Sequence, residues 1–232
     1  MMDFIQVRRE IAGRYLKGKG IEVGALHAPL EVPAGVTVSY VDRLPVAELR
    51  KQYPELATAN LVEADIVDDG ENLASIPDSS WDFVIANHMI EHCQDPIGTL
   101  ENFLRVIKPG GVLYMGVPDK RYTFDIDRPL TSLDHLIRDH TEGAGWSRRS
   151  HFEEWVRLVD KTLEQDVAAR IQYLLDINYS IHFHVWTFET FSELLKYCQT
   201  IFLRNFEIEL FQENFEEVIV ILRKSVNESS LM

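Results

Sequence analysis

The stretch from Trp81 to Val117 constrains the fold most, because it is typical of two strands joined by one helix. Residues 81–86 are apolar over the length of a strand, and so are residues 112–117. Between them, Asp95 precedes a proline at the first position of a helix, and Lys108-Pro-Gly-Gly111 ends that helix. A strand, a helix and a strand in succession predict a parallel crossover, and hence an α/β fold.

The rest of the chain extends this alternation on both sides. Strands are expected at 21–23, 36–42, 61–65, 81–86, 112–117, 206–211 and 218–222, and helices at 3–17, 45–53, 96–107, 131–139, 150–160, 162–175 and 187–199. The last two strands are joined by a loop too short for a helical crossover. The predicted fold is therefore α/β: a doubly wound, mostly parallel seven-stranded sheet with a C-terminal antiparallel strand pair and a helical insertion after the fifth strand.

The connection between the first two strands is unusually short. Residues 25–35 contain two prolines, Pro29 and Pro33, and leave no room for a regular crossover helix. We expect an irregular loop there. The helix at 3–17 is then predicted to cover the face of the sheet that a crossover helix would otherwise cover.

The length and apolar content suit one sizeable core. With 232 residues and 46% hydrophobic content, a single domain over 1–232 is expected. Residues 119–185 break the strand–helix alternation and are predicted to be a helical insertion that caps one end of the sheet. The polar tail, 225–232, is predicted to be disordered.

Charge and cysteine content narrow the possible partners and location. The formal charge is −14, which argues against a nucleic-acid substrate and against binding to an anionic membrane surface. Cys93 and Cys198 form no C-x-x-C pair, so two reduced thiols in a cytoplasmic protein are the simplest expectation. Residues 1–20 lack an apolar segment of signal-peptide length, and no run of about 18 apolar residues is present, so no membrane span is expected.

The sequence His88-Met-Ile-Glu91-His92 has two competing interpretations. Alone, it matches the H-x-x-E-H pattern of zinc proteases, which needs both histidines on one face of a helix. Here a strand precedes it directly, and a new helix begins at Asp95 just after it. We therefore interpret it as the loop after the fourth strand, at the sheet edge where α/β proteins place their ligands. No metal ligand is assigned.

The order of elements and their terminal residues resembles the class I S-adenosylmethionine-dependent methyltransferases, in particular type 11-like methyltransferase domains. The resemblance implies S-adenosylmethionine as cofactor, with S-adenosylhomocysteine as product. Its contacts would come from the ends of the first four strands: Glu22, Gly24, Ala25, Asp42, Asp65, Ile66 and Asn87. A carboxylate such as Asp42 accepts two ribose hydroxyls side by side, and a glycine lets the backbone approach a ligand closely. The family usually has three glycines in the first loop, whereas this chain has Gly24, Leu26 and Ala28.

The same resemblance implies where the methyl acceptor binds. His88 and Asp119 are the candidate catalytic residues, and His88 either takes a proton from the acceptor or only lines the pocket. The insertion would form the acceptor cap, and the candidate acceptor contacts are Arg121, Tyr122, Asp125, His135 and His182. The strings GALHAPL and PDKRYTFDIDRPLT resemble a bacterial branch that accompanies polysaccharide-assembly enzymes. O-methylation of a small-molecule or saccharide hydroxyl is therefore expected, with a homodimer or glycan-assembly enzymes as the implied protein partners.

Two other functions stay open on the sequence alone. A binding module that keeps the fold without catalysis is compatible with the glycine-poor first loop. A zinc hydrolase that uses His88 and His92 needs a third ligand further along the chain.

Overall fold

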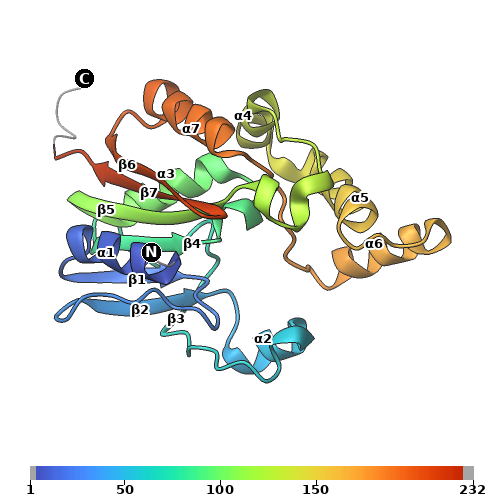
Figure 1. Cartoon of the computed structure of the whole chain (residues 1–232), viewed down its shortest axis with the longest axis horizontal. Coiled ribbons are helices and arrows are strands. Elements are labelled where there is room, and N and C mark those ends of the chain that lie inside the picture. Colours follow the sequence, from blue (N-terminus) through green and yellow to red (C-terminus); the bar gives the residue numbers. More distant parts are fainter. Residues whose placement is uncertain (1–3, 227–232) are drawn as a thin grey trace.

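The computed structural model describes residues 4–226, and the centre of this part of the chain is a seven-stranded sheet (Figure 1). The strands are β1 (Lys19–Val23), β2 (Thr37–Asp42), β3 (Ile66–Val67), β4 (Trp81–Asn87), β5 (Ile107–Pro118), β6 (Phe206–Asn214) and β7 (Glu217–Lys224). The helices are α1 (Phe4–Tyr15), α2 (Val46–Gln52), α3 (Pro96–Val106), α4 (Leu133–Glu142), α5 (Arg148–Leu158), α6 (Val167–Asp176) and α7 (Phe188–Tyr197).

The sheet has the predicted topology. The strand order is β3-β2-β1-β4-β5-β7-β6; all pairs from β3 to β5 are parallel, and β7 pairs antiparallel with both β5 and β6. The order reverses between β1 and β4. At such a reversal the connections leave the sheet in opposite directions, so a crevice forms at the carboxyl ends of the two strands.

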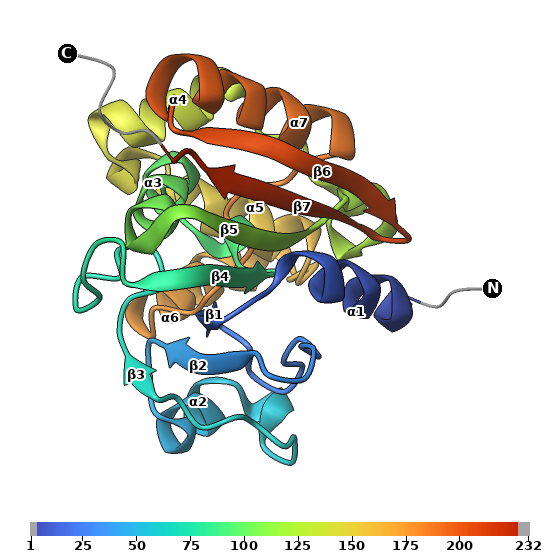
Figure 2. The same cartoon turned by 90° about the vertical axis from the view of Figure 1, so that its left-hand side faces the viewer.

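The side chains of β4 alternate between two apolar layers on opposite faces of the sheet. Figure 2 shows α1 in front of the sheet and α3 behind it. Val84 and Ala86 belong to the larger layer, which α3 and α7 cover. Phe83 and Ile85 belong to the other, which α1 covers with side chains such as Ile11. Residues 25–35 form no helix, so α1 fills the face that a crossover helix would have covered, as predicted.

The prediction for the third strand was wrong. Residues 61–65 are not a strand, and the pairing with β2 begins only at Ile66, opposite Val41. Leu61, which made the segment look like a strand, is buried in a small apolar cluster against Val46 and Leu49 of α2. The pattern assigned Leu61 to the sheet, but tertiary packing buries it against α2 instead.

The helices between β5 and α7 agree with those predicted near 131–139, 150–160 and 162–175. α5 and α6 share a separate apolar cluster that includes Phe152, Ile171 and Phe183. They lie together beyond one end of the sheet (Figure 1). This segment is thus placed to border a ligand site at the strand ends.

The remaining expectations concern the chain ends and the cysteines. The helix expected from residue 3 is described from Phe4 onward, and residues 1–3 and 227–232 lie outside the described residues. The tail expected to be disordered from 225 begins with an ordered contact, because the Ser225 amide donates to the Asn205 carbonyl at 2.7 Å. Both cysteines are buried and unbridged. Within residues 4–226, no helix is long and apolar enough to cross a membrane.

Two glycine substitutions test this packing. Gly20 of β1 faces the Phe83 ring, which is fully buried, so a Cβ at position 20 would clash with a ring that has no space to move into. We expect Gly20→Ala to lower the free energy of unfolding by about 1–3 kcal/mol. Gly13 of α1 has open space around its Cβ position, so Gly13→Ala should raise it by about 0.5–1 kcal/mol. Chemical denaturation measures both; a Gly20→Ala variant as stable as the native chain would contradict the packing of β1 on Phe83.

Candidate functional site

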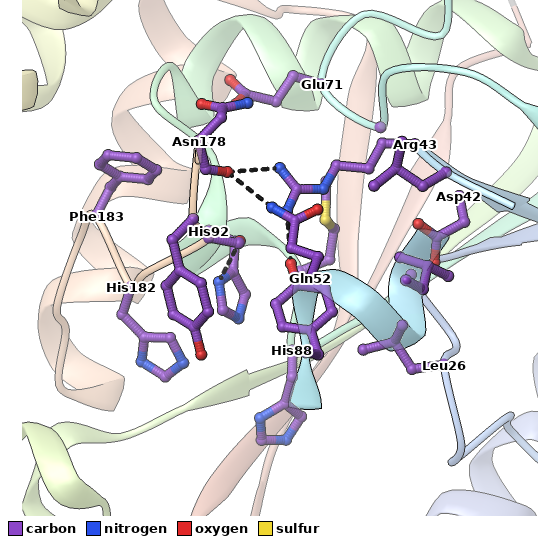
Figure 3. A pocket seen from close by; sticks show the side chains of 18 of the residues that line it. Leu26, Asp42, Arg43, Gln52, Glu71, His88, His92, Asn178, His182 and Phe183 are labelled. Atoms are coloured by element: carbon purple, nitrogen blue, oxygen red, sulfur yellow. Dashed lines mark hydrogen bonds between the residues drawn. The ribbon is translucent and has the colours of Figure 1, made fainter. Parts of the chain in front are cut away.

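A cavity of about 800 Å³ opens where the strand order reverses, at the carboxyl ends of β1, β2 and β4 (Figure 3). Its walls are the loops after these strands, α2, and residues 177–183, which precede α7. The volume lies in the range of small-molecule sites. Of the residues proposed from the sequence to bind cofactor or acceptor, the cavity is lined by Gly24, Asp42, His88 and His182.

Asp42 is the last residue of β2 and has a carboxylate only partly used by the protein. The backbone amides of Arg43 and Leu44 donate to it, and burial raises its pKa. A carboxylate has about four lone-pair sites. The sites left over face a cavity and suit a pair of ribose hydroxyls.

The loop after β1 has the backbone shape of a glycine loop without all of its glycines. Gly24 has φ +69°, and Leu26 has φ +48° although it is not glycine. A left-handed conformation costs a non-glycine residue roughly 1–2 kcal/mol. The Leu26 side chain offsets this cost by packing against the cluster around Leu49 while it lines the cavity. Leu26 therefore stands where the family pattern has a glycine, and its backbone has the left-handed conformation that favours glycine.

His88 follows β4 directly, in a left-handed conformation with φ +48°. Its amide donates to the Gly116 carbonyl at 2.8 Å, which holds this turn. Its Nε2 lies 3.1 Å from Oε2 of Glu217, and its Nδ1 lies 3.6 Å from Oε1 of Glu91, beyond hydrogen-bond distance. The side chain is 37% exposed, and it lines the cavity.

The carboxylates around His88 decide its charge. Burial lowers the pKa of His88, but the hydrogen bond with Glu217 and the negative charges of Glu91 and Glu217 outweigh burial, so the pKa is raised above its ordinary value. Glu217 is itself buried, and Arg8 of α1 binds both of its oxygens at 2.8 and 2.5 Å. His88 is thus held by an anchored carboxylate at Nε2, and its Nδ1 has no hydrogen-bond partner in the part of the chain that the structure describes.

The pair Glu91-His92 forms a single 3₁₀ turn, Ile90–His92, and not a longer helix. The Nδ1 atom of His92 contacts the Ile181 carbonyl at 3.0 Å, and burial lowers the pKa of His92. Neither oxygen of Glu91 has a hydrogen-bond partner among the described residues, and burial raises its pKa. Ligand atoms of Glu91, His92 and His182 lie within 4.8 Å of one another, but His88 does not join them. The His88–His92 pair required by a zinc hydrolase is therefore not formed.

His182 belongs to the opposite wall and is held by a second carboxylate. Its Nδ1 lies 2.7 Å from Oδ2 of Asp125. The other oxygen of Asp125, Oδ1, accepts a hydrogen bond from the buried Arg128 at 2.8 Å. Burial raises the pKa of Asp125, but the contacts with His182 and Arg128 outweigh it, so the pKa is lowered. Asp125 does not line the cavity itself; it fixes the ring of His182, which does.

Glu22 and Asp65, both proposed as cofactor contacts, are used by the protein instead. The Leu30 amide donates to both oxygens of Glu22, at 2.9 and 3.1 Å, and burial raises the pKa of Glu22 to about 7. Glu22 therefore holds the irregular loop 25–35. Asp65 lies before β3, and its carboxylate accepts from the Tyr40 amide at 2.8 Å. Neither residue lines the cavity.

Of the segment that follows β5, Phe124 lines the cavity, whereas the proposed residues Asp119, Arg121 and Tyr122 do not. Asp119 is fully buried, and its carboxylate accepts from the Arg121 guanidinium and from the Phe188 amide at 2.9 Å. It caps the start of α7 and has no contact with a ligand site. Tyr122 is exposed and lies against Phe188. The carboxylate of Asp119 is therefore engaged by Arg121 and by the start of α7.

Four further proposed residues also lie outside the cavity: Ala25, Ile66, Asn87 and His135. Ile66 packs against the core. Asn87 ends β4 beside Gly116, and its side-chain atoms have no partner among the described residues. His135 lies on α4, and it belongs to a cluster with Asp139, His151 and His184, away from the cavity.

Several lining residues were missed. Arg43 and Asp69 follow β2 and β3, and their positions after strand ends were the available signal. Asp69 was missed because β3 begins later than predicted. Tyr179 and Phe183 come from the segment before α7, which no local pattern connects with the sheet. Arg43 connects the loop after β2 with the segment before α7, because it donates a hydrogen bond to the Asn178 carbonyl at 3.1 Å (Figure 3).

Comparison with known proteins places these features in a family. Residues 17–197 match the family model of a methyltransferase domain. A ubiquinone biosynthesis O-methyltransferase of Xanthomonas oryzae pv. oryzae is 30% identical over 115 residues, which cover 49% of this chain and 47% of that protein. The matched region thus spans about half the length of the curated relatives.

Solved structures agree with the fold. A SAM-dependent methyltransferase of Methanosarcina mazei has a TM-score of 0.50 at 14% identity, covering 92% of this chain and 96% of that one. A structure from work on the conversion of a disulfide bond into a thioacetal group in echinomycin biosynthesis has a TM-score of 0.51 at 12% identity, covering 93% and 79%. With the sheet and the cavity described above, the family match shows that the chain belongs to the methyltransferase-domain family.

One pair of variants tests the assignment of the ribose contact. Asp42→Asn removes the charge that accepts the hydroxyls, and we expect affinity for S-adenosylhomocysteine to fall about 10–100-fold, as for a lost hydrogen bond to a charged group. Asp65→Asn keeps an oxygen for the Tyr40 amide and lies outside the cavity, so its affinity should stay within about twofold. Calorimetric titration measures both. Equal losses in the two variants, or none in Asp42→Asn, would contradict the assignment.

Proposed function

We propose that the chain transfers the methyl group of S-adenosylmethionine to a hydroxyl of a small-molecule or saccharide acceptor, with His88 as general base. The observation that carries the proposal is the geometry of His88: it lines the cavity, Glu217 holds its Nε2, and within residues 4–226 its Nδ1 has no hydrogen-bond partner. The O-methyltransferase name of the partly matching relatives supports the same chemistry.

The reaction needs little more than positioning and one proton acceptor. When bound, S-adenosylmethionine would supply an electrophilic methyl group and, once its methyl–sulfur bond breaks, would leave as S-adenosylhomocysteine. The residues of the cavity would hold the acceptor oxygen for this transfer. Nδ1 of His88 takes the hydroxyl proton as the oxygen attacks. The carboxylates of Glu217 and Glu91 then stabilise the imidazolium, which is why they raise its pKa.

The acceptor side of the cavity is aromatic. Phe124, Trp155, Tyr179 and Phe183 line it, with His182 among them. Aromatic faces suit a planar ring or the apolar face of a sugar, and His182 supplies a polar contact that fixes the orientation of the acceptor. These residues come from the helical segment 119–185, which we propose acts as the acceptor cap of a single methyltransferase domain.

The finer assignment rests on the loops that resemble the polysaccharide-assembly branch. We infer from them a saccharide or related cell-envelope acceptor, met in the cytoplasm, with glycan-assembly enzymes or a second copy of the chain as partners. A panel of hydroxylated aromatic compounds and saccharides, incubated with methyl-labelled S-adenosylmethionine, tests this. We expect the label in an ether of one saccharide class; label in an aromatic ether only would overturn the saccharide assignment and keep O-methylation.

A non-catalytic binding module is the second candidate, and the strained Leu26 in the first loop is the observation in its favour. The same panel separates the two. Binding of S-adenosylhomocysteine without transfer of label to any acceptor would support the module. No binding at millimolar concentration would contradict both.

The pH dependence tests the role of His88. A base acts only when neutral, so kcat/KM should rise with pH and level off above the raised pKa of His88, which lies above about 6.5. In His88→Asn, which tolerates the left-handed backbone, we expect kcat/KM to fall about 10²–10⁴-fold and lose this dependence. Affinity for S-adenosylhomocysteine should persist.

His27→Asn serves as the matched control, since His27 is exposed and lies outside the cavity. Its pH profile should match that of the native chain. A His88→Asn variant that keeps most of its activity and the same pH profile would show that His88 only lines the pocket.

A further inference from the structure

Away from the cavity, three imidazoles and one carboxylate converge where α4, α5 and the segment before α7 meet. His135 and Asp139 lie one turn apart on α4, His151 lies on α5, and His184 follows α6. Asp139, His151 and His184 are buried, and His135 is partly buried. Figure 1 shows α4 and α5 beside each other, beyond the end of the sheet.

The distances between the donor atoms have the size of a coordination shell. Nε2 of His135 lies 3.0 Å from Nε2 of His151 and 3.1 Å from Oδ2 of Asp139. Nε2 of His184 lies 3.6 Å from the same oxygen, and one ligand atom from each of the four residues lies within 4.8 Å of all the others. Ligands at about 2.0–2.1 Å from a tetrahedral ion are about 3.3–3.4 Å apart.

Hydrogen bonds account for only part of this convergence: His135 and His151 share one at 3.0 Å, and Nε2 of His184 contacts the Gln94 carbonyl at 3.3 Å. Oδ2 of Asp139 has no hydrogen-bond partner among the described residues. A buried polar atom without a partner is costly, so an ion that binds Oδ2 of Asp139 would remove an energetic penalty.

The surroundings are those of a metal ligand set. Oδ1 of Asp139 accepts from the Ser147 hydroxyl at 2.7 Å, a contact that orients the carboxylate from outside the cluster.

We propose that His135, Asp139, His151 and His184 bind one Zn²⁺ ion in a closed, four-coordinate site. Four protein ligands leave no open position for water or substrate, so the ion is structural. It joins α4 and α5 to the segment that carries His182 and Phe183. These two residues line the cavity, so the ion also stiffens the acceptor wall.

The test begins with the native chain. Protein expressed with zinc should contain about one zinc per chain by elemental analysis, and removal by a chelator should lower the Tm. Titration of the stripped chain with Zn²⁺ should restore the Tm at a one-to-one ratio, and Co²⁺ should give the visible absorption of a tetrahedral site. A stripped chain that binds neither ion at micromolar concentration would overturn the proposal without any variant.

Four variants locate the ion. Asp139→Asn and His151→Gln should weaken zinc binding at least about 100-fold, since each removes a ligand. His140→Gln is the matched control on the same helix, because His140 contacts Asp95 and is not in the cluster; it should bind zinc normally. His182→Gln should also retain zinc. Loss of zinc in His182→Gln but not in His151→Gln would place the ion at Glu91, His92 and His182, and would contradict the proposal.

Discussion

The reversal of strand order between β1 and β4 is the constraint on which the rest of the site depends. Parallel pairing brings the carboxyl ends of β1, β2 and β4 to one edge, and the reversal opens a crevice there. The loops that follow these strands line the cavity, together with α2 and the loop after β3. The apolar layers on both faces, built around alternate residues of β4, hold this edge in place without contacting a ligand.

A single buried carboxylate on β7 connects this edge of the sheet to α1. Glu217, the first residue of β7, binds Arg8 of α1 and the His88 ring together. A buried carboxylate without partners would be strongly destabilising; here it is neutralised on one side by Arg8 and contacts an imidazole on the other. The side chain of Glu217 therefore links helix α1 to His88, the residue proposed as base. Glu217 and Arg8 are more than two hundred residues apart in the sequence.

The sequence was sufficient for the fold but only partly for the site. Strand and helix periods, the Asp95 cap and the short final loop predicted the topology, since these are local signals. Asp42 and His88, predicted at strand ends, line the cavity. Asp65 and Asp119 lie outside it, because backbone amides, which have no sequence signature, use their carboxylates. The histidine cluster on α4 and α5 was unpredictable, because its members meet only through packing of the helical segment.

The central claim is that the cofactor lies at the β1–β4 reversal with its methyl group directed toward His88 and the aromatic wall. A crystal structure with bound S-adenosylhomocysteine tests it most directly. The account predicts the ribose hydroxyls on Asp42, and the homocysteine sulfur between Gly24 and His88 and facing the acceptor wall. A nucleoside bound elsewhere, or a sulfur turned away from His88, would contradict it.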